Sequence, residues 1–149
     1  MKKDTKEKYI LDACALIAYI DFEDGATVIE DLIDRASIGE IHVYINCVNF
    51  LEVYYHTLGL YGKQKAKQLV SYIKDSDINV IFENNMDILI EAGRIKSCNK
   101  LSLADSIGLA TSIVYKGCFV TADYHELETV KKKESLNIIW FRPKKVKKH

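Results

Sequence analysis

Cysteine is sparse in this sequence, and its spacing excludes several kinds of site. Cys14, Cys47, Cys98 and Cys118 lie far apart, each in or beside an apolar run, so the chain has no CxxC motif. We expect buried thiols in a reducing compartment rather than disulfides. The four histidines are scattered as well, which argues against a preformed zinc site. A chain of 149 residues buries enough surface to fold without such cross-links.

Long apolar runs, prolines and linker-like segments are also missing. The stretch 9–20 is too short to span a bilayer and contains Asp12, while Asp4 and Glu7 do not fit the start of a signal peptide. The chain has one proline, seven glycines and no internal repeat. We therefore expect one domain over residues 1–149, in the cytoplasm and without a membrane segment.

Neither sign of charge is in excess, because 21 Lys and Arg balance 21 Asp and Glu. The ends are nevertheless basic: residues 131–149 contain eight Lys or Arg and one acid, and residues 1–8 contain four Lys and two acids. The body between them is therefore acidic. This distribution suits a divalent-cation site beside a contact for a polyanion, although charge runs are most often solvated surface and the pattern alone decides nothing.

Short runs rich in aromatic and β-branched residues alternate with longer stretches of helical spacing. The predicted strands are 9–11, 41–45, 78–82, 118–121 and 137–141, and the predicted helices are 14–20, 26–37, 47–58, 63–76, 85–98 and 103–115. The last helix has the clearest start, because Ser102 and Asp105 form a pattern like a capping box. The alternation predicts an α/β fold with a central, mostly parallel sheet of about five strands and helices on both faces.

Four acidic residues are expected at the carboxyl edge of this sheet, where ligands bind in such folds. Asp12 ends the first predicted strand, and Asp123 closely follows the fourth. Asp105 lies in the first turn of its helix, and Glu52 follows the second strand by about one and a half helical turns. Acids from four distant segments therefore meet at one edge.

The surroundings of these acids favour a bound cation. Glu52 and Asp105 have no Lys or Arg three or four residues away. Clustered carboxylates in partly apolar surroundings have raised pKa values and lower the stability of the fold unless a cation neutralises them. Ligation by carboxylates without histidine or thiolate favours Mg²⁺ or Mn²⁺. A carboxylate-bound Mg²⁺ supports hydrolysis of phosphodiesters by water.

Each acid also has an ordinary structural interpretation. The only role of Asp105 could be a favourable interaction of its negative charge with the dipole at a helix start. Asp12 or Asp123 could be a turn or capping residue. Glu52 on an apolar helix face is harder to explain in that way. The coincidence of all four at one edge is what favours a site. His125 and Glu126, which follow Asp123, are interpreted as exposed residues at a helix start.

Four segments, in order, resemble the PIN-domain family of metal-dependent ribonucleases, in particular the VapC-type toxins of toxin–antitoxin pairs. They are 11–19 (LDACALIAY), 49–55 (NFLEVYY), 101–106 (LSLADS) and 119–123 (FVTAD). The resemblance implies a PIN-like three-layer fold in which Asp12, Glu52, Asp105 and Asp123 bind the catalytic Mg²⁺ or Mn²⁺. It also implies that Thr121 supports the site by hydrogen bonding. Asn49 is a candidate supporting donor near Glu52, while helix capping is the expected role of Asn46.

The resemblance further implies an endoribonuclease that cleaves RNA, forms a homodimer and is inhibited by an antitoxin that inserts a segment into the acidic groove. One residue departs from the family pattern, because Cys14 stands where the family usually has Ser, Thr or Asn. A thiol supports a metal-bound water poorly, so we expect no direct metal contact from Cys14. The basic tail from about residue 142, extended by Lys131 to Lys133, has two interpretations: contact with RNA phosphates, or a solubilising, disordered tail.

Two other functions are compatible with acids at strand ends. A noncatalytic RNA-binding or protein-interaction module on the same fold is the alternative hypothesis, and the changed position at Cys14 is its only sequence support. A phosphoacceptor receiver or aspartyl phosphatase fits poorly. Such phosphatases need a DxD strand, whereas Ala13 and Cys14 follow Asp12, and receivers use a lysine at a strand end that this sequence does not offer.

Overall fold

One five-stranded sheet forms the centre of the computed structural model, which describes residues 3–145. Its strands are β1 (Lys8–Leu11), β2 (His42–Asn46), β3 (Ile78–Ile81), β4 (Cys118–Thr121) and β5 (Ile138–Trp140). They are ordered β3-β2-β1-β4-β5, and all four neighbouring pairs are parallel. The predicted α/β class with a parallel sheet of five strands is confirmed. Residues 146–149 of the predicted basic tail lie outside the described residues.

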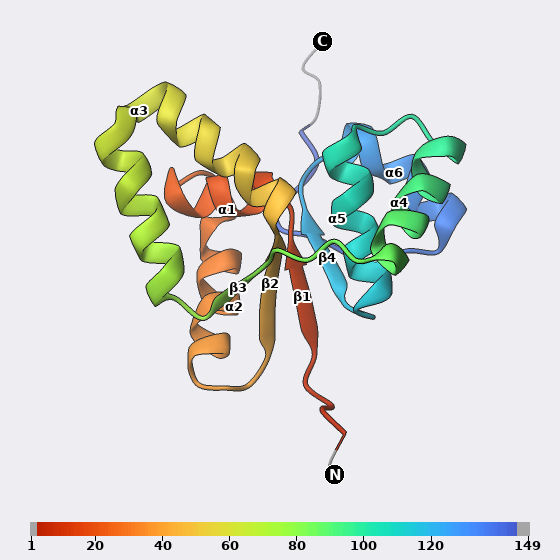
Figure 1. Cartoon of the computed structure of the whole chain (residues 1–149), viewed down its shortest axis with the longest axis horizontal. Coiled ribbons are helices and arrows are strands. Elements are labelled where there is room, and N and C mark those ends of the chain that lie inside the picture. Colours follow the sequence, from red (N-terminus) through yellow and green to blue (C-terminus); the bar gives the residue numbers. More distant parts are fainter. Residues whose placement is uncertain (1–2, 146–149) are drawn as a thin grey trace.

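Helices cover both faces of the sheet, which gives the predicted three layers (Figure 1). They are α1 (Ala13–Ile20), α2 (Ala26–Ser37), α3 (Cys47–Asp75), α4 (Met86–Cys98), α5 (Leu103–Val114) and α6 (Tyr124–Glu134). One buried apolar cluster joins the sheet to α1, α2 and α3, and includes Leu16, Ile29 and Val43. The other joins it to α4, α5 and α6 around Leu109 and Phe119. No helix within residues 3–145 is long and apolar enough to cross a bilayer.

The two helices expected at 47–58 and 63–76 are the two arms of α3, which meet at a sharp kink. Helix α3 folds back at Gly62, whose φ of 85° and ψ of 178° interrupt the helical backbone (Figure 1). That φ is accessible to glycine without the steric cost that a Cβ would impose. The two predicted helices are confirmed, and they are joined at a single non-helical glycine.

Helix α6 was absent from the predicted helices, although it carries part of the site. Only Leu127 and Val130 of this helix are buried, so its apolar stripe is too thin to detect among many charged residues. Its start did leave a signal. Asp123 is the N-cap and accepts a hydrogen bond from the backbone N–H of Glu126 at 3.2 Å, which is the Asp-x-x-Glu spacing of a helix start.

The four cysteines are free thiols, but they are less buried than predicted. Cys14, Cys47 and Cys118 are half-buried, and Cys98 is exposed. The expectation of burial is wrong for Cys98 because it is the last residue of α4, where the chain leaves the apolar face of the helix.

A close approach between α5 and its neighbours depends on Gly108. A Cβ at this position would lie 2.9 Å from Cε1 of Phe119 and 3.0 Å from Oδ1 of Asn49. Both neighbours are fully buried, so neither has open space to move into. The helix that carries Asp105 can therefore lie this close to the helix that carries Asn49 and Glu52 only because residue 108 has no side chain.

We expect Gly108→Ala to lower the free energy of unfolding by about 1–3 kcal/mol, because the added methyl group overpacks a filled core. Urea denaturation measures this difference. Gly93→Ala is the matched control: Gly93 is exposed in α4, with nothing within 4 Å of the added Cβ. It should raise stability by up to about 1 kcal/mol, since alanine is the better helix former. Equal stability of the two variants would contradict the close approach described here.

Candidate active site at the carboxyl edge of the sheet

Asp12 and Asp123 follow the two neighbouring strands β1 and β4 at the carboxyl edge of the sheet, which is the upper edge in Figure 1. Asp12 is the N-cap of α1, and its Oδ1 accepts a hydrogen bond from the backbone N–H of Ala13 at 2.8 Å. Asp123 is the N-cap of α6. Each acid therefore joins a strand end to a helix start, where the backbone N–H groups and the helix dipole favour negative charge.

Asp105 and Glu52 reach the same edge from helices that begin there. Asp105 lies in the first turn of α5, whose N-cap Ser102 accepts a hydrogen bond from the backbone N–H of Asp105 at 3.1 Å. Glu52 lies in the second turn of α3 and is half-buried, whereas Asp12 and Asp105 are buried. All four predicted acids line one open cleft.

Besides the capping residue Ser102, three further residues with polar groups line this cleft and were not identified from the sequence as site residues. Tyr55 and His56 belong to α3, and Glu126 belongs to the first turn of α6. Nε2 of His56 lies 2.9 Å from Oδ2 of Asp21. The i,i+4 spacing from Glu52 was the signal that would have found His56. Glu126 is half-buried, so its interpretation as an exposed helix-start residue is corrected; His125 is exposed as expected.

Thr121 connects the two acids at the strand ends. Its hydroxyl donates a hydrogen bond to Oδ2 of Asp12 at 2.8 Å and accepts one from the backbone N–H of Asp123 at 3.1 Å. Thr121 is fully buried, so these bonds are shielded from water and hold their geometry. One side chain thereby fixes the orientation of the Asp12 carboxylate and the backbone that leads to Asp123.

Asn49 connects α3 to α5 behind the other two acids. Its side-chain amide donates hydrogen bonds to the backbone carbonyl of Ala104 at 3.2 Å and to Oε1 of Glu52 at 3.4 Å. Oδ1 of this buried side chain has no hydrogen-bond partner within residues 3–145. Asn46 is the N-cap of α3, as predicted, and also donates a hydrogen bond to Oγ1 of Thr111 at 2.9 Å.

Cys14 lies beside Asp12 but has the chemistry of a neutral thiol. Its Sγ is 3.5 Å from Oδ2 of Asp12 and 3.6 Å from Oγ1 of Thr121. Burial raises the pKa of this thiol, and the charge of Asp12 raises it further. The thiol stays protonated and donates a weak hydrogen bond, in the place where a hydroxyl or amide would donate a stronger one.

Comparison with known proteins identifies the family. The family model of the PIN domain matches residues 9–133. The chain is a PIN domain. This match spans all four acids and five of the six helices in full, together with most of the sixth. A search of curated protein sequences finds no match.

Solved structures share the fold of this PIN domain at low sequence identity. A toxin–antitoxin complex from Klebsiella pneumoniae is 16% identical with a TM-score of 0.65, covering 90% of this chain and 98% of that chain. DNA-bound VapBC from Salmonella typhimurium is 13% identical with a TM-score of 0.68, covering 91% and 99%. VapBC2 from Rickettsia felis, bound to a fragment of promoter DNA, is 14% identical with a TM-score of 0.67, covering 89% and 97%. At these identities the likeness demonstrates the fold alone.

The electrostatics of the PIN-domain cleft are dominated by loss of solvent around the acids. Burial, as the main cause, together with the charges of Asp12, Asp123 and Glu52 raises the pKa of Asp105 to about 7. Burial also raises the pKa of Asp12 to about 6, against the lowering effect of hydrogen bonds from Thr121 and Ala13. The pKa of Glu52 is raised for the same primary reason. The predicted upward shifts are confirmed for these three acids.

The carboxylate groups of the cleft are chemically suited to a hard divalent cation, although the acidic side chains are not arranged around one common position. Carboxylate oxygens are the ligands that Mg²⁺ and Mn²⁺ prefer, and raised carboxylate pKa values indicate negative charge that lacks compensation. Within residues 3–145, no group of three or more His, Cys, Asp or Glu side chains is arranged so that it could hold a metal ion. The acids therefore share a cleft without forming a closed cage.

We expect the metal-free protein to lose stability as the pH rises from about 4 to about 7. The folded-state pKa of Asp105, about 7, lies above its ordinary value of 3.8, so the native state binds more protons than the unfolded state in this window. The loss should be about 2 kcal/mol after allowance for solvent screening. Urea denaturation in the presence of a chelator, at a series of pH values, measures it.

Asp105→Asn should flatten this dependence, because the amide cannot ionise. Asp31→Asn, on the exposed face of α2, should leave it unchanged. If stability fell equally with pH in the wild-type protein, Asp105→Asn and Asp31→Asn, the raised pKa of Asp105 would not be the source of this dependence.

Proposed function

We propose that this PIN domain is a metal-dependent endoribonuclease that hydrolyses RNA phosphodiester bonds in the cytoplasm, as the toxin of a toxin–antitoxin pair. The observation that carries the proposal is the convergence of Asp12, Glu52, Asp105 and Asp123 in one cleft. Membership of the PIN-domain family supports a nuclease. The four acids are the proposed ligands of Mg²⁺ or Mn²⁺.

The residues around the cleft have different roles in the proposed hydrolysis. The four carboxylates would hold a divalent cation, which would supply positive charge to the phosphate oxygens and the leaving oxygen. One carboxylate also positions the attacking water or accepts its proton. Thr121 holds the Asp12 carboxylate through its 2.8 Å hydrogen bond, and Asn49 holds Glu52 through its 3.4 Å contact. Such supporting donors restrict the carboxylates to orientations in which they can act together.

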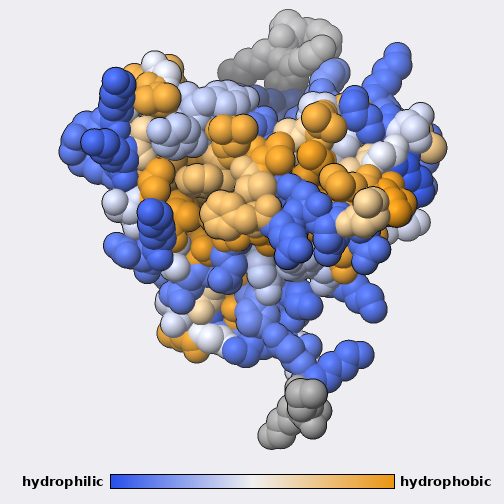
Figure 2. Space-filling view, in the orientation of Figure 1, coloured by the Kyte–Doolittle hydropathy of each residue, from blue (hydrophilic) through white to orange (hydrophobic). Residues whose placement is uncertain are grey.

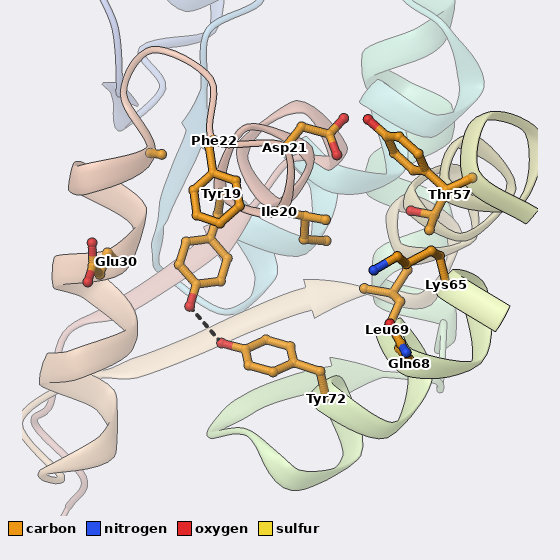
Figure 3. Close-up of a pocket in the computed structure, with 12 residues that line it drawn as sticks. Tyr19, Ile20, Asp21, Phe22, Glu30, Thr57, Lys65, Gln68, Leu69 and Tyr72 are labelled. Carbon is orange, nitrogen blue, oxygen red and sulfur yellow. Dashed lines mark hydrogen bonds between the residues drawn. The ribbon is translucent and has the colours of Figure 1, made fainter.

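An antitoxin partner is inferred from the structural neighbours and from a second cleft in this chain. The neighbours from Klebsiella pneumoniae and Salmonella typhimurium are, respectively, a toxin–antitoxin complex and a DNA-bound VapBC. The second cleft lies between α1, α2 and both arms of α3 (Figure 3). It is lined mainly by apolar and aromatic groups, among them Ile20, Phe22 and Leu69, and the hydroxyls of Tyr19 and Tyr72 meet across it at 3.0 Å.

This aromatic cleft adjoins the acidic cleft at one polar contact between two side chains. Asp21 lines the aromatic cleft, and His56, 2.9 Å away, lines the acidic one. Phe22 is 91% exposed, so the entrance to the aromatic cleft presents a large apolar ring to solvent. These features fit an antitoxin segment that places apolar side chains in the aromatic cleft and continues toward the four acids.

A homodimer is inferred from a separate apolar surface. Five large apolar residues are more than half exposed: Leu51 on α3, Phe82 between β3 and α4, Met86 and Ile90 on α4, and Leu103 at the start of α5. Figure 2 shows apolar surface across the middle of the viewed face and over its right-hand part. Apolar area of this kind on a small domain is typical of a surface that is covered by a partner, and a second copy supplies a self-complementary one.

A noncatalytic RNA-binding or protein-interaction module is the second candidate function. Two observations favour it: Cys14 stands beside Asp12 as a weak hydrogen-bond donor, and the acids of residues 3–145 do not surround a common point. Such a module would keep the acidic cleft for recognition of a partner rather than for a cation.

Cleavage of RNA with added Mg²⁺ or Mn²⁺ is the direct test. We expect purified protein to cleave RNA, EDTA to abolish cleavage, and Asp12→Asn to reduce its rate by at least about 100-fold, because a metal ligand contributes at least as much as the residues that orient it. Gel electrophoresis of labelled RNA gives the rate. Asp31→Asn, an exposed acid outside the cleft, should cleave at the wild-type rate. Cleavage that survives both EDTA and Asp12→Asn would refute the mechanism.

Calorimetric titration with Mg²⁺ separates the two candidate functions. The nuclease should bind Mg²⁺, alone or with RNA present, and should bind it more tightly as the pH rises above the pKa of Asp105, because bound protons compete with the cation. Failure to bind Mg²⁺ even with RNA present would favour the noncatalytic module.

A further inference from the structure

Among residues 3–145, the acidic cleft has no permanently cationic side chain to attract the phosphates on either side of a cleavage site. None of the side chains from residues 3–145 that line it is a lysine or arginine. A divalent cation neutralises charge only at the acids themselves, while RNA carries a negative charge at every nucleotide. An RNA strand that enters this cleft therefore needs cationic residues immediately outside it.

A groove next to the acidic cleft supplies such residues, and the two concavities share Asp123. The wall opposite α6 is formed by Arg142, Lys144 and Lys145, and α6 contributes His125. The topology explains this placement. Trp140 of β5 pairs with Thr121 of β4 in the parallel sheet, so the residues after β5 emerge at the same edge as Asp123.

The first part of the cationic wall is fixed against the protein. The backbone N–H of Phe141 donates a hydrogen bond to the carbonyl of Thr121 at 3.2 Å, and the Phe141 side chain is buried. The hydroxyl of Tyr124 donates to the carbonyl of Arg142 at 2.9 Å, and its ring stacks on Trp140 with the ring centres 4.1 Å apart. These contacts hold the beginning of the basic segment beside α6.

Further positive charge continues along α6. A second concavity, which shares Glu128 and Thr129 with the groove, is lined by Lys132 and Lys133. The ammonium group of Lys133 donates a hydrogen bond to the carbonyl of Cys98 at 2.6 Å, whereas the charge of Lys132 is one of the causes that lower the pKa of Glu128 in the groove. The cationic surface therefore extends from Asp123 along one side of α6.

We propose that the basic groove, formed by His125, Lys132, Arg142, Lys144 and Lys145, binds the backbone phosphates of the RNA strand next to the bond that is cleaved. The proposal rests on the proposed nuclease function and adds to it the path of the substrate. Lysines act as point charges, so the contact is independent of sequence and positions the strand without selecting its bases.

One acid in the groove competes with the phosphates for a lysine. Nζ of Lys144 lies 2.6 Å from Oε2 of Glu128, and both side chains are largely exposed. RNA must exchange this carboxylate for a phosphate when it binds. Removing the carboxylate should therefore strengthen binding, whereas a purely structural role of the ion pair would predict no such gain.

Binding of a short, fluorescein-labelled single-stranded RNA of mixed sequence, followed by fluorescence anisotropy with EDTA present, tests the groove. The variant Lys144→Gln/Lys145→Gln should bind roughly tenfold more weakly at physiological salt, and the slope of log affinity against log salt should fall by about 1.4, which is about 0.7 for each lost phosphate contact. Glu128→Gln should bind about two- to fivefold more tightly. Lys63→Gln/Lys67→Gln, on the exposed surface of α3, is the matched control and should change neither quantity.

Cleavage by the wild-type protein, measured on the same RNA with Mg²⁺, distinguishes the failure of this inference from failure of the proposed function. If the wild-type protein cleaves but the Lys144→Gln/Lys145→Gln variant matches the control in affinity and salt slope, the groove is refuted and the nuclease stands. If the wild-type protein binds through these lysines but does not cleave, the groove stands and the nuclease is refuted. A wild-type protein that neither binds nor cleaves refutes both.

Discussion

Negative charge crowded into a partly dry cleft is the constraint to which the surrounding structure responds. Burial and mutual repulsion raise the pKa of Asp105 to about 7 and that of Asp12 to about 6. The fold offsets part of this repulsion by placing acids where backbone dipoles favour them. Asp12 and Asp123 are N-caps, and Asp105 lies in the first turn of α5, so three of the four acids meet the positive ends of helices. A cation would offset much of the remainder.

The distance between the acids is set by contacts that lie behind the cleft. Gly108 allows α5 to approach Asn49 of α3, and Asn49 holds both the backbone of α5 and the carboxylate of Glu52. Asn46 begins α3 and bonds to Thr111 of α5. The orientation of Glu52 relative to Asp105 therefore depends on buried polar bonds between two helices. Such bonds are costly to break in a dry environment, which makes the cleft part of the folded core.

How much the sequence predicts depends on whether a position is set by local geometry or by packing. The sequence predicts the positions of three acids because a strand end or a helix start fixes them at the carboxyl edge: Asp12, Asp105 and Asp123. The position of Glu52 follows from the regular rise of a helix. Helix α6 escaped prediction because only Leu127 and Val130 mark its buried face. The arrangement of the carboxylates, which do not surround one point within residues 3–145, depends on side-chain rotamers and could not be inferred from spacing.

The acidic and basic parts of the sequence form two adjacent surfaces in the fold, because β5 lies beside β4. The acids come from the strand ends and helix starts of the body, whereas all the lysines of the groove follow residue 131. Pairing of Trp140 with Thr121 brings the basic segment to the edge that carries Asp123. A polyanion would thus be attracted by one surface and meet the acids at the next, so its attraction would not require the cation of the proposed hydrolysis. Under the proposed function, affinity for the backbone and rate of cleavage would depend on different residues, even though Asp123 belongs to both concavities.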